Sequence, residues 1–100
     1  MFIYNVTIGI DRDVEEEWVI WMKETHIPRV MNTGLFYDNK MFRVLTADED
    51  NISYSVQYFA EDISTVEKYL NDYAPGLIQE HNEKFKNRHA AFRTLLQRID

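Results

Sequence analysis

The sequence predicts an α+β fold of the ferredoxin-like type, with the element order β-α-β-β-α-β. Four segments alternate apolar and polar residues with the period of a strand, and two longer segments between them repeat apolar residues at helical spacing. In this order the elements form a four-stranded antiparallel sheet with two helices on one face. Since 100 residues is close to the size of one domain, we predict a single ferredoxin-like domain over residues 1–100.

The first element is a strand over residues 2–10. Tyr4 and Val6 alternate there with Asn5 and Thr7, which is the pattern of a half-buried strand. An aspartate at position 11 or 13 can cap the helix that follows. Three consecutive glutamates then place negative charge in the first helical turn, where the helix dipole favours it.

The first helix carries an apolar stripe, which we expect to face the core. The stripe consists of Val14, Trp18, Trp21, Met22 and Thr25. Pro28 lacks an amide hydrogen and disfavours a helical residue before it. We therefore expect the helix to stop or kink near His26 and to resume as a short turn that ends at Gly34.

Two strands come next, over residues 35–47 and 52–60. An acidic turn at residues 48–51 separates them, so we expect an antiparallel hairpin. The turn lacks the spacing and the glycine of a calcium-binding loop, and a solvated turn is the simpler interpretation.

The second helix is predicted from a capping-box pattern, Ser-Thr-Val-Glu, at residues 64–67. Apolar residues then continue at helical spacing as far as His81, interrupted by Pro75 and Gly76. The last strand is expected over residues 90–99, where alternation returns.

The two faces of the predicted sheet differ in polarity. One face carries the larger side chains and is expected to meet the helices: Tyr4, Val6, Ile8, Tyr54, Val56 and Tyr58. The other carries small, uncharged polar side chains: Asn5, Thr7, Ser53, Ser55 and Gln57. A sheet face left in water usually carries charge, because bare strands aggregate. We therefore predict a homodimer in which two such faces pack together, with Arg43 and Arg93 supplying polar contacts.

Composition limits the classes of partner. With 17 acidic and 11 basic residues the net charge is -6, which disfavours nucleic acid and anionic membranes. The chain has no cysteine, so thiolate metal sites and disulfides are excluded. No apolar run approaches the roughly 20 residues that span a bilayer. We predict a cytoplasmic protein without a nucleic-acid partner, a membrane segment, a cofactor or a bound metal.

His26 is the best single candidate for a functional residue. It lies at the edge of the apolar stripe just before Pro28, where a helix break can open a cavity. A neutral imidazole there could act as a general base or bind a ligand carbonyl. The simpler interpretation is a histidine that bonds a freed backbone carbonyl. His81 also points inward at helical spacing, and either brackets a pocket with His26 or is a packed core histidine.

Aromatic side chains could line a pocket for a flat organic molecule. The pocket candidates are Trp18, Trp21, His26, Tyr54, Tyr58, Tyr73 and His81. Aromatic residues at core spacing are more often simply core, but a buried tyrosine hydroxyl needs a partner, and a ligand can be that partner.

The run Trp-Met-Lys-Glu-Thr-His-Ile-Pro-Arg-Val at residues 21–30, followed by Thr-Gly-Leu-Phe at residues 33–36, resembles the first-helix signature of the dimeric α/β-barrel superfamily. Nearly the whole chain is similar to a small bacterial family within it that is catalogued only as a domain of unknown function. The superfamily includes cofactor-free and haem-degrading monooxygenases, isomerases and amino-acid-sensing modules. The resemblance implies the ferredoxin-like fold and a homodimer, but no catalytic residue.

Two functions remain open from the sequence. In the first, a homodimer binds or turns over a small organic molecule in a pocket between helices and sheet, with His26 as its polar anchor. In the second, the dimer is a non-enzymatic protein-interaction module that presents its basic carboxyl-terminal surface or its acidic first helix. A cavity that touches His26 favours the first, and a closed core favours the second. Whether the protein is an enzyme stays open.

Overall fold

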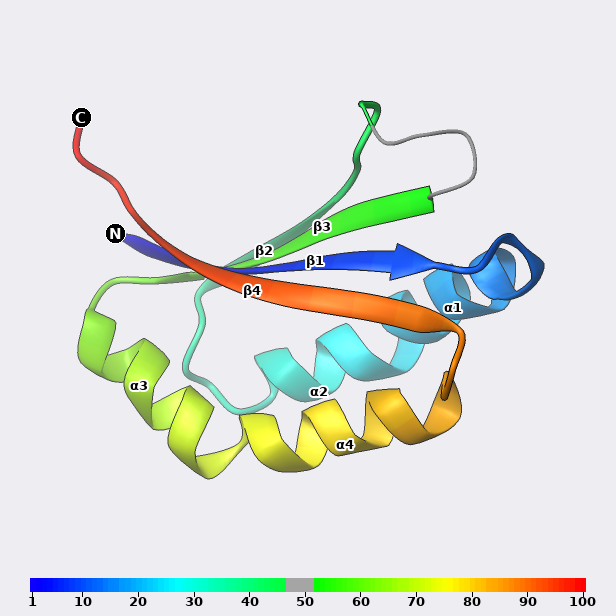
Figure 1. Cartoon of the computed structure of the whole chain (residues 1–100). Helices are drawn as coiled ribbons and strands as arrows, with labels where there is room; N and C mark the ends of the chain where they lie inside the picture. Colours follow the sequence, from blue (N-terminus) through cyan, green and yellow to red (C-terminus); the bar gives the residue numbers. More distant parts are fainter. Residues whose placement is uncertain (47–51) are drawn as a thin grey trace.

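The computed structural model describes residues 1–46 and 52–100, and in it a four-stranded antiparallel sheet carries all the helices on one face (Figure 1). The sheet order is β2-β3-β1-β4. The strands are β1 (Phe2–Ile10), β2 (Asp38–Arg43), β3 (Ile52–Ala60) and β4 (His89–Gln97); the helices are α1 (Glu15–Trp21), α2 (Ile27–Met31), α3 (Ile63–Asp72) and α4 (Ala74–Lys84). The predicted ferredoxin-like fold is confirmed. The predicted acidic turn at residues 48–51 lies outside the described residues.

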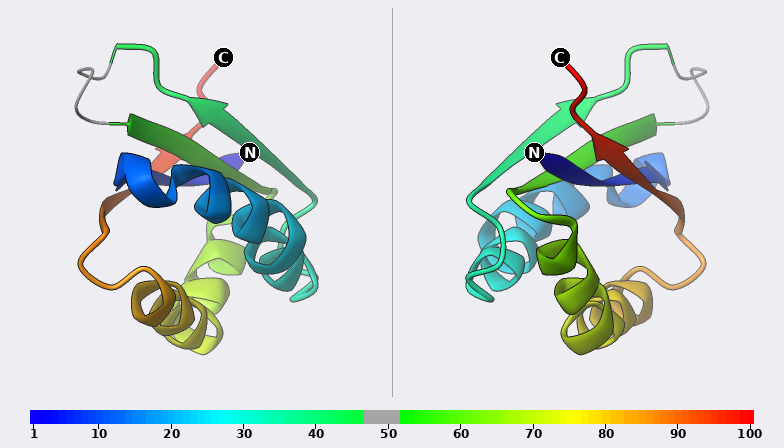
Figure 2. Two further views of the ribbon diagram at one scale, coloured as in Figure 1. Left: turned by 90° about the vertical axis from the view of Figure 1, so that its right-hand side faces the viewer. Right: turned by 90° about the vertical axis from the view of Figure 1, so that its left-hand side faces the viewer.

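The core lies between the sheet and the helices, as the two side views show (Figure 2). β1 and β3 sit in the centre of the sheet and turn alternate side chains towards the helices, so Tyr4, Val56 and Tyr58 are each at most 2% exposed. Trp18 and Met22 meet them from the helical layer and are just as deeply buried. Burial of each such side chain contributes roughly 1.5–3 kcal/mol.

The first helix does not end at the proline but changes its winding. Residues Met22–His26 form a π-helical turn between α1 and α2, in which the amide of Ile27 bonds the carbonyl of Met22. Pro28 has no amide hydrogen to offer the preceding turn, and a shift to i→i−5 bonding accommodates that loss. α2 ends at Met31, and the turn that follows reaches Gly34, whose φ of 76° is favourable mainly for glycine. The helix is therefore irregular near His26, as predicted, and the irregularity is a π-helical turn.

The start of the second helical segment differs from the prediction. α3 begins at Ile63 with Asp62 as its N-cap, and no side-chain capping bond is present there. The capping-box interpretation of residues 64–67 was therefore wrong, because those residues lie inside the helix. The predicted interruption at Pro75 is correct: α3 ends at Asp72, and Pro75 lies in the first turn of α4, where its missing amide costs nothing.

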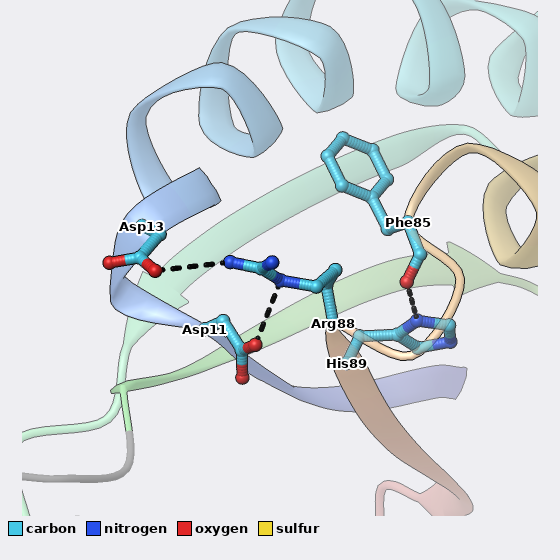
Figure 3. Close-up of polar contacts among 5 residues, drawn as sticks. All are labelled: Asp11, Asp13, Phe85, Arg88 and His89. Carbon is cyan, nitrogen blue, oxygen red and sulfur yellow. Dashed lines mark hydrogen bonds and ion pairs between the residues drawn. The ribbon is translucent and has the colours of Figure 1, made fainter.

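A cluster of polar contacts joins the start of β4 to the end of β1 (Figure 3). The Arg88 guanidinium lies 2.9 Å from a carboxylate oxygen of Asp11 and 3.2 Å from one of Asp13. The amide of Asp11 also donates to the carbonyl of Arg88 over 2.9 Å. His89 then donates from Nδ1 to the carbonyl of Phe85 over 2.8 Å. These contacts hold the start of β4 beside the end of β1.

The face of the sheet opposite the helices is open. Its side chains form rows across the strands, and one row runs from Phe42 through Ser55 and Thr7 to Phe92. Small residues occupy the two central strands of this row, while the aromatic rings at the edges are 49% and 63% exposed. The open face is therefore more apolar than the sequence indicated.

Two expectations about the edge strands were wrong. β2 begins only at Asp38 and ends at Arg43, so it is shorter than residues 35–47. Arg43 pairs in register with Tyr54, and Arg93 pairs with Val6, which places both arginines on the helix-facing side and not on the open face. The strand period of two decides this, since directly paired residues share a face. Among the described residues, no helix is long and apolar enough to cross a membrane.

Candidate functional site

A cavity of about 30 Å³ lies between the sheet and the two helical segments. Its lining comes from β1, β3, β4, the π-helical turn and the two later helices: Tyr4, Val6, Ile8, Met22, His26, Val56, Tyr58, Tyr69, Ile78, His81, Ala91 and Arg93. A cavity of this size holds one or two water-sized groups. It cannot enclose a whole organic molecule, so a larger ligand would place only its tip there.

Two polar atoms of residues that line this cavity have no hydrogen-bond partner within the described residues. They are Nδ1 of His26 and the hydroxyl of Tyr58, and both atoms are buried. Tyr58 as a whole is 2% exposed. Buried polar groups in native proteins are nearly always satisfied, so two orphaned groups on one small cavity are unusual. Each is a donor or an acceptor that no described residue satisfies.

Burial keeps the histidines and tyrosines of the cavity neutral. It lowers the pKa of His26 to about 4, with a further lowering by the nearby Arg29 guanidinium. Burial likewise raises the pKa of Tyr58 and of Tyr69 far above the usual tyrosine value. At neutral pH the cavity therefore offers an uncharged imidazole and uncharged hydroxyls.

His81 is neutral for a geometric reason as well. The indole Nε1–H of Trp18 donates to Nε2 of His81 over 2.9 Å. An indole nitrogen can only donate, so Nε2 of His81 must be the unprotonated acceptor. Burial lowers the pKa of His81 to about 4, and the neighbouring His89 adds to that effect. The lone pair of His81 is therefore occupied, and this ring supports the core.

Arg93 is the only charged side chain that lines the cavity, among the residues the structure describes. Its Nε donates to the hydroxyl of Tyr4 over 3.2 Å. The positive charge of Arg93 also opposes the rise in the pKa of Tyr4 that burial causes. Since Arg93 itself is solvent-exposed, the guanidinium marks the side of the cavity that is nearest to water.

The structure brings three of the predicted pocket residues to the cavity, namely His26, Tyr58 and His81. Trp18 and Trp21 do not line it: Trp18 is fully buried beside His81, and Trp21 packs on His26 with 5.3 Å between ring centroids.

The other two predicted pocket residues also lie away from the cavity. The Tyr54 hydroxyl donates to Glu15 over 2.6 Å, and burial and that bond raise the pKa of Tyr54 to about 12. Tyr73 is 40% exposed and stacks on the outside of Tyr69.

Several lining residues were not among the predicted pocket residues, above all Arg93 and Tyr69. Arg93 was assigned to the wrong face, because its side depends on the register of β4 against β1, which the sequence does not give. Tyr69 lies one helical turn before Tyr73. The rotation of α3 about its axis decides which of the two tyrosines reaches the cavity. Helical spacing alone does not fix that rotation.

The histidines do not form a metal site. Ring centroids of His26 and His81 lie 5.8 Å apart, and those of His81 and His89 lie 4.7 Å apart. Within residues 1–46 and 52–100, no three histidine, cysteine or acidic side chains come together as a set of ligands.

Comparison with known proteins agrees with the fold described above. Residues 1–99 match the model of a family described as a domain of unknown function, DUF4286. No curated protein matches the chain. Among solved structures, a dimeric ferredoxin-like protein from an uncultured marine organism is similar with a TM-score of 0.74 and 13% identity, covering 99% of this chain and 95% of that one.

Two further solved structures share the fold. An ethyl tert-butyl ether D family protein from Bacillus halodurans has a TM-score of 0.71 at 10% identity, covering 99% of this chain and 100% of that one. SnoaB, described as a cofactor-independent oxygenase from Streptomyces nogalater, has a TM-score of 0.69 at 14% identity, with 99% and 94% covered. At these identities the similarity shows a common fold and no common chemistry.

Proposed function

The chain belongs to the DUF4286 family, and because that description assigns no activity, we propose a function from the site itself: the protein binds a small organic molecule whose tip enters the cavity beside His26 and Tyr58. The observation that carries this proposal is the pair of buried, unpartnered polar atoms on one cavity. A core that served stability alone would satisfy or remove them, since each unsatisfied buried group costs roughly 1–3 kcal/mol.

The electrostatics of the site support binding more directly than acid–base catalysis. A histidine whose pKa is about 4 is a weak base at neutral pH, and general bases work best when their pKa lies near the working pH. As a neutral ring, His26 is well suited to donate or accept one hydrogen bond. Burial raises the pKa of Tyr58, so its hydroxyl stays protonated and can donate a hydrogen bond to a ligand oxygen.

We place this site in a homodimer that forms through the open face of the sheet. Phe42, Phe92 and Leu96 lie on that face at its edges and are 49%, 63% and 41% exposed. Patches of apolar residues on a monomer's surface usually mark an interaction site. Large residues at the edges and small ones in the centre allow two copies related by a two-fold axis to interlock. The marine-organism protein of the same fold is described as dimeric.

The binding proposal is tested by removing the Tyr58 hydroxyl. Ligand-observed NMR with a set of small carboxylates, phenols and amides would identify molecules that bind the intact protein. Tyr58→Phe should weaken their binding about three- to tenfold, the value of one hydrogen bond. The same variant should also have a higher free energy of unfolding, because it deletes an unsatisfied buried group. Tyr37→Phe is the control, since Tyr37 is 54% exposed and does not line the cavity.

The alternative function, a protein-interaction module without a small ligand, is decided by the same experiment. If no member of the set binds, or if Tyr58→Phe binds as well as the intact protein while losing stability, the hydroxyl is a structural group and the binding proposal fails.

A further inference from the structure

We infer that the molecule bound at this cavity is a small monocarboxylate, whose carboxylate pairs with Arg93 while an oxygen at its other end bonds Tyr58 or His26. The inference rests on the binding function proposed above and adds the chemical class of the ligand.

The first argument is the unmatched charge of Arg93. Three other arginines each have a carboxylate partner: Arg29 pairs with Glu80, Arg88 with Asp11 and Asp13, and Arg98 with Asp100. Arg93 has no such partner among the described residues, and only its Nε is engaged, at the Tyr4 hydroxyl. Its two terminal nitrogens are therefore free to form the parallel pair of bonds that a carboxylate accepts from a guanidinium.

The second argument is the number of charges at the site. His26 and His81 are neutral at pH 7, because their pKa values are about 4, so Arg93 supplies the only positive charge on the lining that the structure describes. A ligand with one negative charge is matched by it. A dianion such as a phosphate monoester carries a second charge for which the described lining offers no cationic partner.

The third argument is how the polar groups are distributed. Arg93 is exposed, whereas the Tyr58 hydroxyl and Nδ1 of His26 are buried. A bound molecule therefore has its charged end near water and an uncharged oxygen at the inner end. The inner space of about 30 Å³ accepts that oxygen and one further small group at most. The part of the molecule between its two ends stays outside the enclosed volume.

The experiment compares carboxylates with carboxamides of the same shape. The probes are 4-hydroxybenzoate and 4-hydroxybenzamide, and a shorter aliphatic pair, 4-hydroxybutyrate and 4-hydroxybutyramide, with affinities measured by ligand-observed NMR at low salt. We expect at least one acid to bind the intact protein at least tenfold more tightly than its amide. We also expect inorganic sulfate, a dianion at neutral pH, not to displace it at the same concentration.

Variants of Arg93 connect this preference to one side chain. Arg93→Gln should reduce carboxylate affinity at least tenfold and leave amide affinity unchanged, so that the preference disappears. Arg93→Lys should keep part of it, because an ammonium supplies the charge but not the paired bonds. Arg43→Gln is the matched control: this arginine lies on the same side of the sheet but at the other edge, and it does not line the cavity. Circular dichroism of each variant checks that it is folded.

The outcomes separate this inference from the function on which it rests. Equal binding of acids and amides, or a preference that Arg93→Gln leaves intact, overturns the inference while the binding function stands, provided that Tyr58→Phe still weakens binding. Displacement by sulfate overturns the monoanion argument. If neither acids nor amides bind, both the inference and the proposed function fail.

Discussion

Trp18 Nε1 donates a hydrogen bond to His81 Nε2 over 2.9 Å, between residues that lie 63 positions apart in the chain. The bond joins the first helix to α4 inside the core, and it sets the proton of His81 on Nδ1. It also divides the two inward histidines by role: His81 has its lone pair engaged, whereas Nδ1 of the neighbouring His26 has no partner in the described structure.

Removal of the acceptor in this pair should destabilise the protein. His81→Leu leaves the indole N–H of Trp18 buried without a partner, and we expect the free energy of unfolding to fall by about 1–3 kcal/mol. Trp18→Phe combined with His81→Leu removes both partners, so the two effects should not add. Urea denaturation of the two single variants and the double variant gives the coupling energy, which we expect at roughly 0.5–3 kcal/mol. A coupling energy near zero would show that the bond contributes nothing.

Stability should fall as the solution is acidified from pH 6.5 to pH 4. Burial lowers the pKa of both His26 and His81 from 6.5 to about 4, so in this range the unfolded chain binds protons that the folded chain does not. The free energy of unfolding therefore rises with pH through this window. The contribution of the two histidines to stability is fully present above pH 6.5. Each of the two pKa shifts changes the free energy of unfolding by on the order of 3 kcal/mol.

NMR titration of the histidine ring protons, together with urea denaturation at several pH values, checks this dependence. His26→Gln removes one of the two groups and should roughly halve the loss of stability on acidification. A ring of His26 or His81 that titrates near pH 6.5 in the folded protein would contradict the prediction.

Self-association should depend on the open face of the sheet and not on the helical face. Phe42 on the open face and Ile20 on α1 are both 49% exposed, so their replacement by glutamate adds the same charge at equally accessible positions. We expect Phe42→Glu to give a monomer and Ile20→Glu to leave the dimer intact. Sedimentation velocity at several concentrations measures this. A dimer that survives Phe42→Glu but not Ile20→Glu would place the interface on the helices instead.

The ion pairs of Arg88 should contribute little to stability despite their short distances. Arg88 and its partners Asp11 and Asp13 are well exposed, and exposed pairs of this kind are typically worth 0.2–1 kcal/mol each. Arg88→Met should lower the free energy of unfolding by about 1 kcal/mol in dilute buffer and by less in 1 M salt. Arg98→Met, which removes only the local pair with Asp100, should have a smaller effect. A loss well above 2 kcal/mol would mean that Arg88 acts through packing.

The candidate site was only partly predictable. His26 was identified from its position two residues before Pro28. A proline disturbs the backbone hydrogen bonds of a helix whatever that helix packs against. Tyr58 was identified because the alternation of residues along its strand places it on the helix-facing side of the sheet. Arg93 was placed on the wrong face, and Tyr73 was chosen in place of Tyr69, since each depends on how one element is set against another.

The sequence by itself determined the order of elements, the helix-facing sides of β1 and β3, and the break near His26, because these follow from alternation, helical spacing and the missing amide of proline, all of which act over a few residues. Only the tertiary structure decided that Trp18 donates a hydrogen bond to His81, that His26 and Tyr58 share a cavity, and that Arg93 borders it. Those relationships join residues that are distant in the chain, and strand register and helix rotation, which no local pattern encodes, bring them together.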